Sequence, residues 1–280
     1  MPRRDRALII IGGHEDKEDD KLILRAVAER TGRGKLVIAT VASNHQGELG
    51  DEYETIFRGL GVRHVYKLRI ETREDAMSEK CVRILDDTET VFFTGGDQLK
   101  ITSQLGLSPV CKRLQEIYES GGTIAGTSAG ASVMSTTMMV GGIAEQTPRL
   151  GDGLQLAPGL GFIEDVIVDQ HFSERGRIGR LLAAVAQNPR TLGVGIDENT
   201  AVIVEQDNKF TVLGEGGVCF VDGGDMSYTN ITEEESDRAL STFDVRLHVL
   251  TQGDVFDCRT RRPIAHEAKQ IEEQLLGSSV

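Results

Sequence analysis

The first half of the chain alternates between short apolar runs and longer stretches whose apolar residues recur every three or four positions. The apolar runs are Arg6–Ile11, Lys35–Val41, Val62–Leu68, Thr90–Phe93 and Thr123–Ala125. Such runs are typical of strands buried on both faces. The helical spacing lies between them, over Asp20–Arg30, Leu49–Leu60, Arg73–Leu85, Gln98–Gly106 and Pro109–Glu119. This alternation predicts an α/β fold built on a doubly wound, mainly parallel sheet.

The second half changes character and becomes richer in strand patterns. Strands are predicted at Asp165–Asp169, Leu192–Asp197 and Ala201–Val204, and a helix runs from about Arg177 to Gln187, where Asn188-Pro189 stops it. The segments 209–221 and 244–249 are β-rich, and 265–276 predicts a polar amphipathic helix. Because no linker or repeat interrupts the chain, we expect one domain over residues 1–280. Residues 1–205 would hold the main sheet and the active site, and residues 206–280 a β-rich extension.

Composition and charge narrow the function classes. Hydrophobic residues make up 39% and charged residues 27%, as in ordinary globular proteins. The net charge of −13 argues against general nucleic-acid binding, which needs a basic face. No apolar run approaches a membrane span, and Met1–Asp5 does not lead into a signal-peptide core, so we expect no membrane contact and a cytoplasmic protein. The four cysteines are widely spaced, which favours free thiols over a metal site.

The stretch with the clearest chemical potential is Gly126-Thr127-Ser128-Ala129-Gly130. It follows a strand pattern and precedes small, helix-compatible residues. A sharp strand-to-helix turn exposes a serine hydroxyl, and flanking glycines remove side chains that would collide there. The N–H of Ala129 would then lie where an oxyanion develops. Ser128 is therefore a candidate nucleophile.

A serine nucleophile needs a base and an orienting acid. His171 is the best candidate base because it ends a predicted strand in Asp169-Gln170-His171; His14, in the Gly12-Gly13 loop, is its competitor. Asp197 and Glu198 follow another buried strand, and either could orient the base. The order Ser, His, acid differs from that of α/β-hydrolases, so this is not a lipase signature.

Two further clusters suit substrate binding. In Gly95-Gly96-Asp97-Gln98, which follows a predicted strand, the N–H of Gly96 or Asp97 could complete an oxyanion hole with Ala129, and Gln98 could hold peptide groups. Arg175, Arg177 and Arg180 follow the candidate base, and arginine holds carboxylates in a two-pronged fashion. Because ligands bind beyond the carboxyl ends of parallel strands, the glycine loops are expected to meet at one crevice.

Together these motifs resemble the cyanophycinases, which belong to a serine peptidase family that also contains aspartyl dipeptidases. The matching segments occur in register with the family pattern over most of the chain. They are Gly12–Lys17, Phe93–Gln98, Gly126–Ala131, Asp169–Leu181 and Gly195–Ala201. The segment Asp169–Leu181 is the most specific of them. His14 departs from the pattern, because a small residue is expected at that position.

The resemblance implies a fold like that of class I glutamine amidotransferases, with serine in place of cysteine. It implies exopeptidase cleavage of cyanophycin, a poly-aspartate carrying arginine on each β-carboxyl, into β-Asp-Arg dipeptides. Ser128 would attack, His171 would act as base and then acid, and Glu198 would orient His171. The substrate would be lined by Gln98, Asp169, Gln170, Arg175 and Arg180. No metal or organic cofactor is required, and family members are typically homodimers.

Two alternatives stay open. An aspartyl or isoaspartyl dipeptidase could use the same three residues, although the arginine-rich segment after His171 favours the polymer as substrate. A catalytically silent binding protein could also use this fold, because fold does not fix function. The intact set Ser128, His171 and Glu198 argues against the silent protein.

Overall fold

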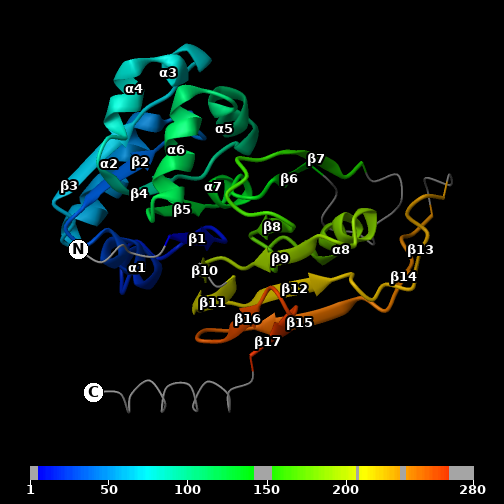
Figure 1. Ribbon diagram of the computed structural model, residues 1–280. Helices are drawn as coiled ribbons and strands as arrows, with labels where there is room; N and C mark the ends of the chain where they lie inside the picture. The colour runs from blue at the N-terminus through cyan, green and yellow to red at the C-terminus, as the bar shows by residue number, and fades with distance from the viewer. Residues whose placement is uncertain (1–5, 142–152, 206–207, 234–237, 265–280) are drawn as a thin grey trace.

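The computed structural model describes residues 6–141, 153–205, 208–233 and 238–264. Its centre is a nine-stranded mixed sheet in the order β17-β16-β11-β10-β1-β5-β4-β2-β3 (Figure 1). The five strands of the first half are mutually parallel: β1 (Ala7–Ile11), β2 (Lys35–Ala39), β3 (His64–Leu68), β4 (Thr88–Phe93) and β5 (Thr123–Thr127). The mainly parallel α/β architecture predicted from the sequence is confirmed for this half.

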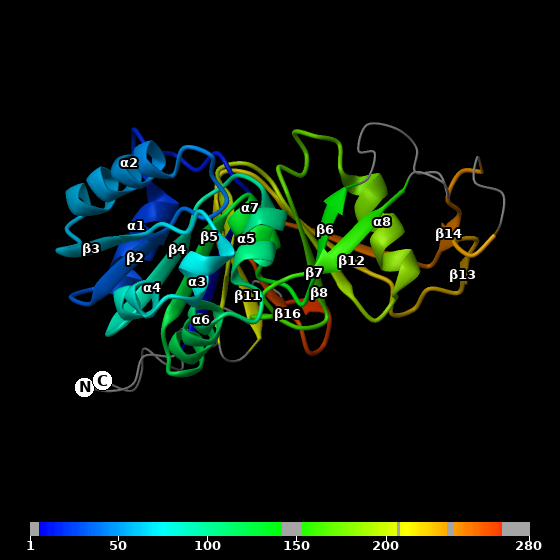
Figure 2. The same cartoon turned by 90° about the horizontal axis from the view of Figure 1, so that it is seen from above.

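Helices cover both faces of the parallel strands, as Figure 2 shows from above. They are α1 (Leu22–Thr31), α2 (Gln46–Gly59), α3 (Arg73–Met77), α4 (Glu79–Ile84), α5 (Gln98–Leu105), α6 (Pro109–Glu119) and α7 (Ala129–Ser132). Residues of β1 alternate between two cores: Ile9 packs in the cluster that contains α1 and α2, and Leu8 packs in the cluster that contains α5 and α6. Because both sides of β1 are buried, its sequence is apolar throughout.

The second half contributes a separate four-stranded sheet. Its order is β15 (Arg246–Leu250), β12 (Val218–Asp222), β9 (Leu192–Ile196) and β8 (Val166–Gln170), with β8 and β9 parallel. Helix α8 (Ile178–Gln187) packs on β9 and β12. Short two-stranded ribbons complete the β structure: β6 (Thr137–Gly141) with β7 (Gln155–Pro158), and β13 (Tyr228–Thr229) with β14 (Thr242–Phe243).

The β-rich extension divides between the two sheets. β10 (Thr200–Val204) runs antiparallel to both β1 and β11 (Lys209–Gly214), and β16 (Val255–Asp257) and β17 (Arg262–Pro263) continue the main sheet beyond β11. Strands β12 and β15 join the second sheet instead. The β-rich character is therefore confirmed, whereas the single-domain organisation stays a prediction. The helix expected at 265–276 lies outside the described residues.

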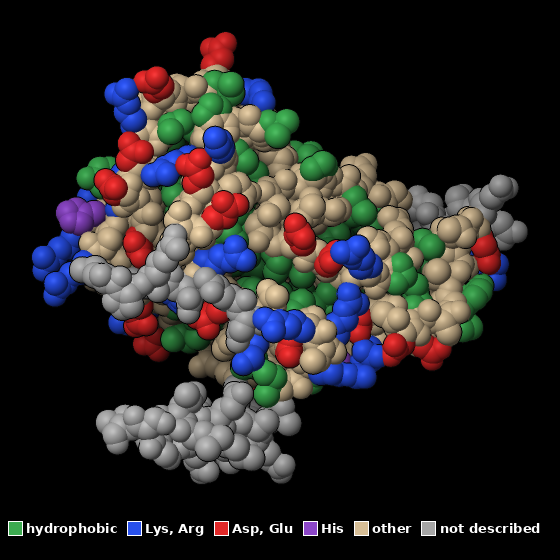
Figure 3. Space-filling view, in the orientation of Figure 1, with side chains coloured by type: hydrophobic (Ala, Val, Ile, Leu, Met, Phe, Trp, Pro, Cys, Tyr) green, Lys and Arg blue, Asp and Glu red, His purple; other side chains and the backbone are tan. Residues whose placement is uncertain are grey.

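The structure also differs from the prediction at one helix. The single helix expected at Arg73–Leu85 is two, because Ser78 adopts extended backbone and its hydroxyl caps α4 by accepting the N–H of Cys81 at 3.3 Å. All four cysteines are free thiols. Within the described ranges no helix is long and apolar enough to span a bilayer. Figure 3 shows acidic and basic side chains interspersed over the face it presents.

Candidate active site

Ser128 lies at the sharp turn between β5 and α7. Its backbone has φ 53° and ψ −111°, a conformation that non-glycine residues rarely adopt, and its N–H donates to the carbonyl of Ile11 at 3.0 Å. A Cβ on Gly126 would lie 2.5 Å from the carbonyl oxygen of Gly130, and one on Gly130 would lie 2.6 Å from that of Phe93. Glycine at both positions therefore lets the turn form, as the sequence pattern predicted.

His171 follows the last residue of β8, in a left-handed backbone conformation (φ 47°). Its N–H donates to the carbonyl of Gly12 at 2.8 Å, which joins the second sheet to the loop after β1. The imidazole is buried, and its Nε2 lies 3.1 Å from the Oγ of Ser128. The strand end predicted from the sequence thus brings His171 to the serine across the junction of the two sheets.

Glu198 lies two residues beyond the end of β9, the parallel neighbour of β8. Its Oε1 is 2.5 Å from the Nδ1 of His171. Asp197, the other acid left open by the sequence, instead accepts the N–H of Ser173 at 3.0 Å and that of Gly217 at 2.9 Å. Asp197 therefore holds two loops together, and Glu198 is the acid in contact with the imidazole.

Ser128, His171 and Glu198 thus form one chain of hydrogen bonds. In this arrangement the serine O–H can donate to Nε2 while Nδ1–H donates to the carboxylate. Burial lowers the pKa of His171, and the hydrogen bond that His171 donates to Glu198 opposes this only in part. Burial raises the pKa of Glu198, but the hydrogen bond from His171 and the nearby His14 outweigh it, so its pKa lies below the usual value. A neutral imidazole beside an ionised carboxylate is able to take the serine proton.

His14 occupies the other side of Glu198. Its Nδ1 lies 2.9 Å from Oε2, and its ring meets that of His171 edge-on with centroids 5.0 Å apart. The adjacent Gly13 has φ 109°, and a Cβ there would lie 2.4 Å from the His171 ring. The sequence named His14 as a competing base; in the structure it contacts the acid, and its departure from the family pattern was the one signal that set it apart.

The loop after β4 approaches the serine from the other side. A Cβ on Gly95 would lie 3.4 Å from that of Ser128. The N–H of Asp97 donates to the carbonyl of Ala42 at 3.0 Å, which removes it from the two oxyanion-hole candidates and leaves Gly96. Ala129 is the first residue of α7, so its N–H has no acceptor within that helix. The amide of Gln98 donates to the carbonyl of Met139 at 3.0 Å.

The predicted substrate residues next to His171 divide into two groups. Asp169 is 1% exposed, and both Arg177 and Arg180 pair with it; the Nε of Arg180 lies 2.7 Å from Oδ2. The amide oxygen of Gln170 lies 3.5 Å from the Oγ of Ser128, whereas Arg175 is exposed. In the structure Gln170 therefore lies beside the serine, whereas Asp169 and Arg180 form an ion pair with each other.

Glu15 belongs to the site, but the sequence reasoning gave it no role. It is 4% exposed; Oε2 accepts the hydroxyl of Thr127 at 2.5 Å, and Oε1 accepts the hydroxyl of Tyr53. Burial, and then the charge of Glu15, raise the pKa of Tyr53 well above 10.0. Because Thr127 precedes Ser128, its hydrogen bond to Glu15 helps to hold the serine turn in position. Its position in the Gly12–Lys17 motif was the available signal.

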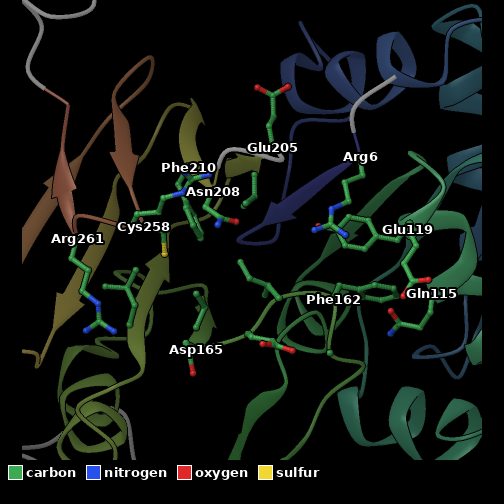
Figure 4. A pocket seen from close by; sticks show the side chains of 18 residues that line it. Arg6, Gln115, Glu119, Phe162, Asp165, Glu205, Asn208, Phe210, Cys258 and Arg261 are labelled. Atoms are coloured by element: carbon green, nitrogen blue, oxygen red, sulfur yellow. The ribbon is translucent and has the colours of Figure 1, made fainter. Parts of the chain in front are cut away.

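A cavity of about 740 Å³ lies away from these residues, near the amino ends of β1 and β8 (Figure 4). In Figure 4 Arg6, Gln115 and Glu119 lie on one wall, and Cys258 and Arg261 on the other. None of the residues that line it belongs to the serine, histidine and glutamate set. The hydrogen-bonded set supplies a nucleophile and a base, which the volume of this cavity alone does not.

Comparison with known proteins identifies the family of the chain. Residues 8–212 match peptidase family S51. A cyanophycinase of Nostoc sp. is 40% identical over 265 residues (93% of this chain and 89% of the relative), and one of Geminocystis herdmanii is 36% identical over 262 residues (92% and 96%). A crystal structure of a peptidase from an acI-B1 actinobacterium shares the fold, with a TM-score of 0.67 at 22% identity, covering 91% of this chain and 98% of that one. The chain therefore belongs to peptidase family S51 and is a serine-type peptidase.

Proposed function

We propose that this peptidase is an exopeptidase that hydrolyses cyanophycin to β-Asp-Arg dipeptides. The observation that carries the chemistry is the hydrogen-bonded series Ser128, His171 and Glu198. The substrate assignment is supported by the relatives named cyanophycinase, which match more than nine-tenths of the chain. It is also supported by the arginine-rich segment that follows His171.

In the proposed mechanism Ser128 attacks the scissile carbonyl while His171 accepts its proton at Nε2. The N–H groups of Gly96 and Ala129 stabilise the oxyanion of the tetrahedral intermediate. His171 then protonates the leaving amine, and an acyl-enzyme remains on Ser128. Water attacks the ester with His171 again as base, and Glu198 stabilises the imidazolium formed in each half-reaction.

The substrate contacts are proposed from exposure and proximity. Gln170 lies beside the nucleophile, and Gln98 lies just beyond the loop that approaches it, so both amides suit the polar backbone of the polymer. Arg175 is exposed and suits a carboxylate of the substrate. Asp169 and Arg180 serve the site through their ion pair, which fixes the segment that carries Arg175. Replacing Arg175 by Gln is expected to raise KM more than it lowers kcat.

The decisive experiment incubates the purified chain with insoluble cyanophycin beside the Ser128→Ala variant, without added metal. Mass spectrometry of the soluble products should find β-Asp-Arg from the first time points with the intact serine. The variant should be slower by on the order of 10⁴-fold or more. Its thermal unfolding and its binding to the polymer should match those of the parent chain. Comparable turnover by the variant would refute the nucleophile.

The same assay separates the competing functions. Release of larger fragments first would indicate an endopeptidase. Hydrolysis of a small Asp-Xaa panel without release from the polymer would make the protein an aspartyl or isoaspartyl dipeptidase. No hydrolysis of either would leave the silent binding protein.

The resemblance also supports two proposals about the protein's state. We propose that it is a homodimer and that it acts in the cytoplasm. Light scattering after size-exclusion chromatography tests the first, since a monomeric mass would contradict it. Cell fractionation with an antibody tests the second.

A further inference from the structure

His14, His171 and Glu198 together form a set of three side chains, each of which can offer one ligand atom to a metal ion. Donor atoms of His14, His171 and Glu198 all lie within 4.8 Å of one another. The set contains two imidazoles and one carboxylate, a combination that suits zinc, whereas magnesium prefers oxygen ligands and is disfavoured by the two imidazole nitrogens. His171 and Glu198 have steps of their own in the proposed hydrolysis without a metal, whereas His14 contacts both residues and has no step of its own.

The geometry permits an ion to reach these atoms. Zinc holds its ligand atoms at roughly 2.0–2.2 Å, so neighbouring donors end up roughly 3.3 Å apart. No pair therefore needs to approach by more than about 1.5 Å. The His14 side chain is 73% exposed and that of Glu198 is 26% exposed, so both can turn toward an ion that enters from solvent. The buried His171 can then stay in place.

We propose that His14, His171 and Glu198 form an inhibitory binding site for Zn²⁺, with water in the fourth position. Binding replaces the hydrogen bond between His14 and Glu198, and an ion on Nδ1 of His171 replaces the one between His171 and Glu198 as well. It also removes the base whichever nitrogen of His171 the ion takes. An ion on Nε2 occupies the lone pair that accepts the serine proton; an ion on Nδ1 leaves the ring proton on Nε2, which then has no lone pair to accept it. The inhibition rests on the proposed function, whereas the metal binding does not.

Calorimetry with zinc chloride on the full-length Ser128→Ala variant tests the binding, because this variant retains all three donors. One saturable site per chain is expected, and magnesium chloride should give no heat. Adding His14→Asn should weaken zinc binding by at least about tenfold, the loss that disturbing a metal's surroundings commonly produces. Asparagine tolerates the left-handed backbone of His14 (φ 46°) and can still donate to Glu198 while lacking an imidazole.

His45→Asn is the matched control. His45 is an exposed histidine whose Nδ1 lies 4.0 Å from a carboxylate oxygen of Glu48. Zinc affinity should be unchanged in this variant. Glu198→Gln, which removes the carboxylate ligand, gives a second and independent loss if His14→Asn does not fold. Equal affinity in the His14→Asn and parent forms, or no saturable site, would overturn the proposal.

Activity then tests the consequence. Zinc should inhibit the parent chain reversibly, with recovery after EDTA, and the His14→Asn variant should need at least about tenfold more zinc for half-inhibition of its own rate. Zinc bound through His14 without loss of hydrolysis would refute the inhibitory role. If cyanophycin is not the substrate, the calorimetry still decides whether the site exists.

Discussion

Two carboxylates near the ends of the neighbouring strands β8 and β9 have opposite surroundings. Asp169 is 1% exposed and is held by the guanidinium groups of Arg177 and Arg180. The Glu198 side chain is 26% exposed and lies between the imidazoles of His171 and His14. The two acids are close in the fold and differ in what surrounds them.

The partners decide what each carboxylate can do. Burial lowers the pKa of Arg177 to about 10, which still leaves the guanidinium beside Asp169 charged at neutral pH. Burial lowers the pKa of His171 below the usual 6.5, so this imidazole beside Glu198 is neutral and can accept a proton. We infer that Asp169 holds the segment after β8 in position, whereas Glu198 takes part in proton transfer. Each prediction below perturbs one side of this contrast.

The largest effect is expected for Glu198→Gln. The amide leaves the side-chain shape but cannot stabilise the imidazolium, so kcat should fall by about 10³–10⁴-fold. The free energy of unfolding should change by no more than about 1 kcal/mol, because the side chain is partly exposed. Rate measurements on cyanophycin and urea titrations give both values. The control is Glu174→Gln. In the parent chain the carboxylate of Glu174 accepts the N–H of Glu198 at 3.2 Å. A loss of less than tenfold in Glu198→Gln would contradict the orienting role.

Asp169→Asn should show the reverse pattern, with its main effect on the free energy of unfolding instead of on kcat. It leaves the buried guanidinium of Arg177 and the partly buried one of Arg180 without their counter-charge, which commonly costs about 3–5 kcal/mol of unfolding free energy. Urea denaturation measures the loss. Asp165→Asn is the control, because Asp165 pairs with Arg190 in an exposed position and should cost at most about 1 kcal/mol. If Asp169→Asn kept its stability but lost substrate binding, Asp169 would contact the polymer instead.

The sequence predicted the parallel half of the fold well because its strands are buried on both faces and are continuously apolar. The run RALIII is typical of a strand buried on both faces. The serine turn was equally predictable from the sequence, because the turn requires glycine where a Cβ at position 126 or 130 has no room. Local composition dictated both features.

The remainder depends on contacts between distant segments, which periodicity does not encode. The strand patterns of β9 and β12 do not reveal that these strands leave the main sheet to form a second one. The pairing of Asp169 with Arg180 uses residues 11 apart, and Glu15 meets Thr127 across 112 residues. The link between His14 and Glu198 spans 184 residues. The sequence therefore grouped Ser128, His171 and Glu198, but it did not predict the partners of Asp169, Glu15 and His14.

The smallest expected effect concerns the pH dependence of hydrolysis. His171 must be neutral to accept the serine proton, and burial lowers its pKa below the usual 6.5. Activity should therefore persist below that pH and fall only as the solution becomes more acidic. The positive charge of Arg175 also lowers the pKa of His171, because it disfavours a second cation nearby.

Arg175→Gln removes that charge, so the pKa of His171 rises and the imidazole is protonated at higher pH. The acidic limb of kcat/KM should then move to higher pH, whatever the variant does to KM. Arg190→Gln is the control, because Arg190 pairs with Asp165 and is not among the charges that act on His171. Initial rates over a series of buffers at constant ionic strength measure the limb. A limb that stays in place would mean that substrate or solvent screens Arg175 from the base, and a limb that moves would make this exposed arginine an electrostatic neighbour of the imidazole as well as a binding residue.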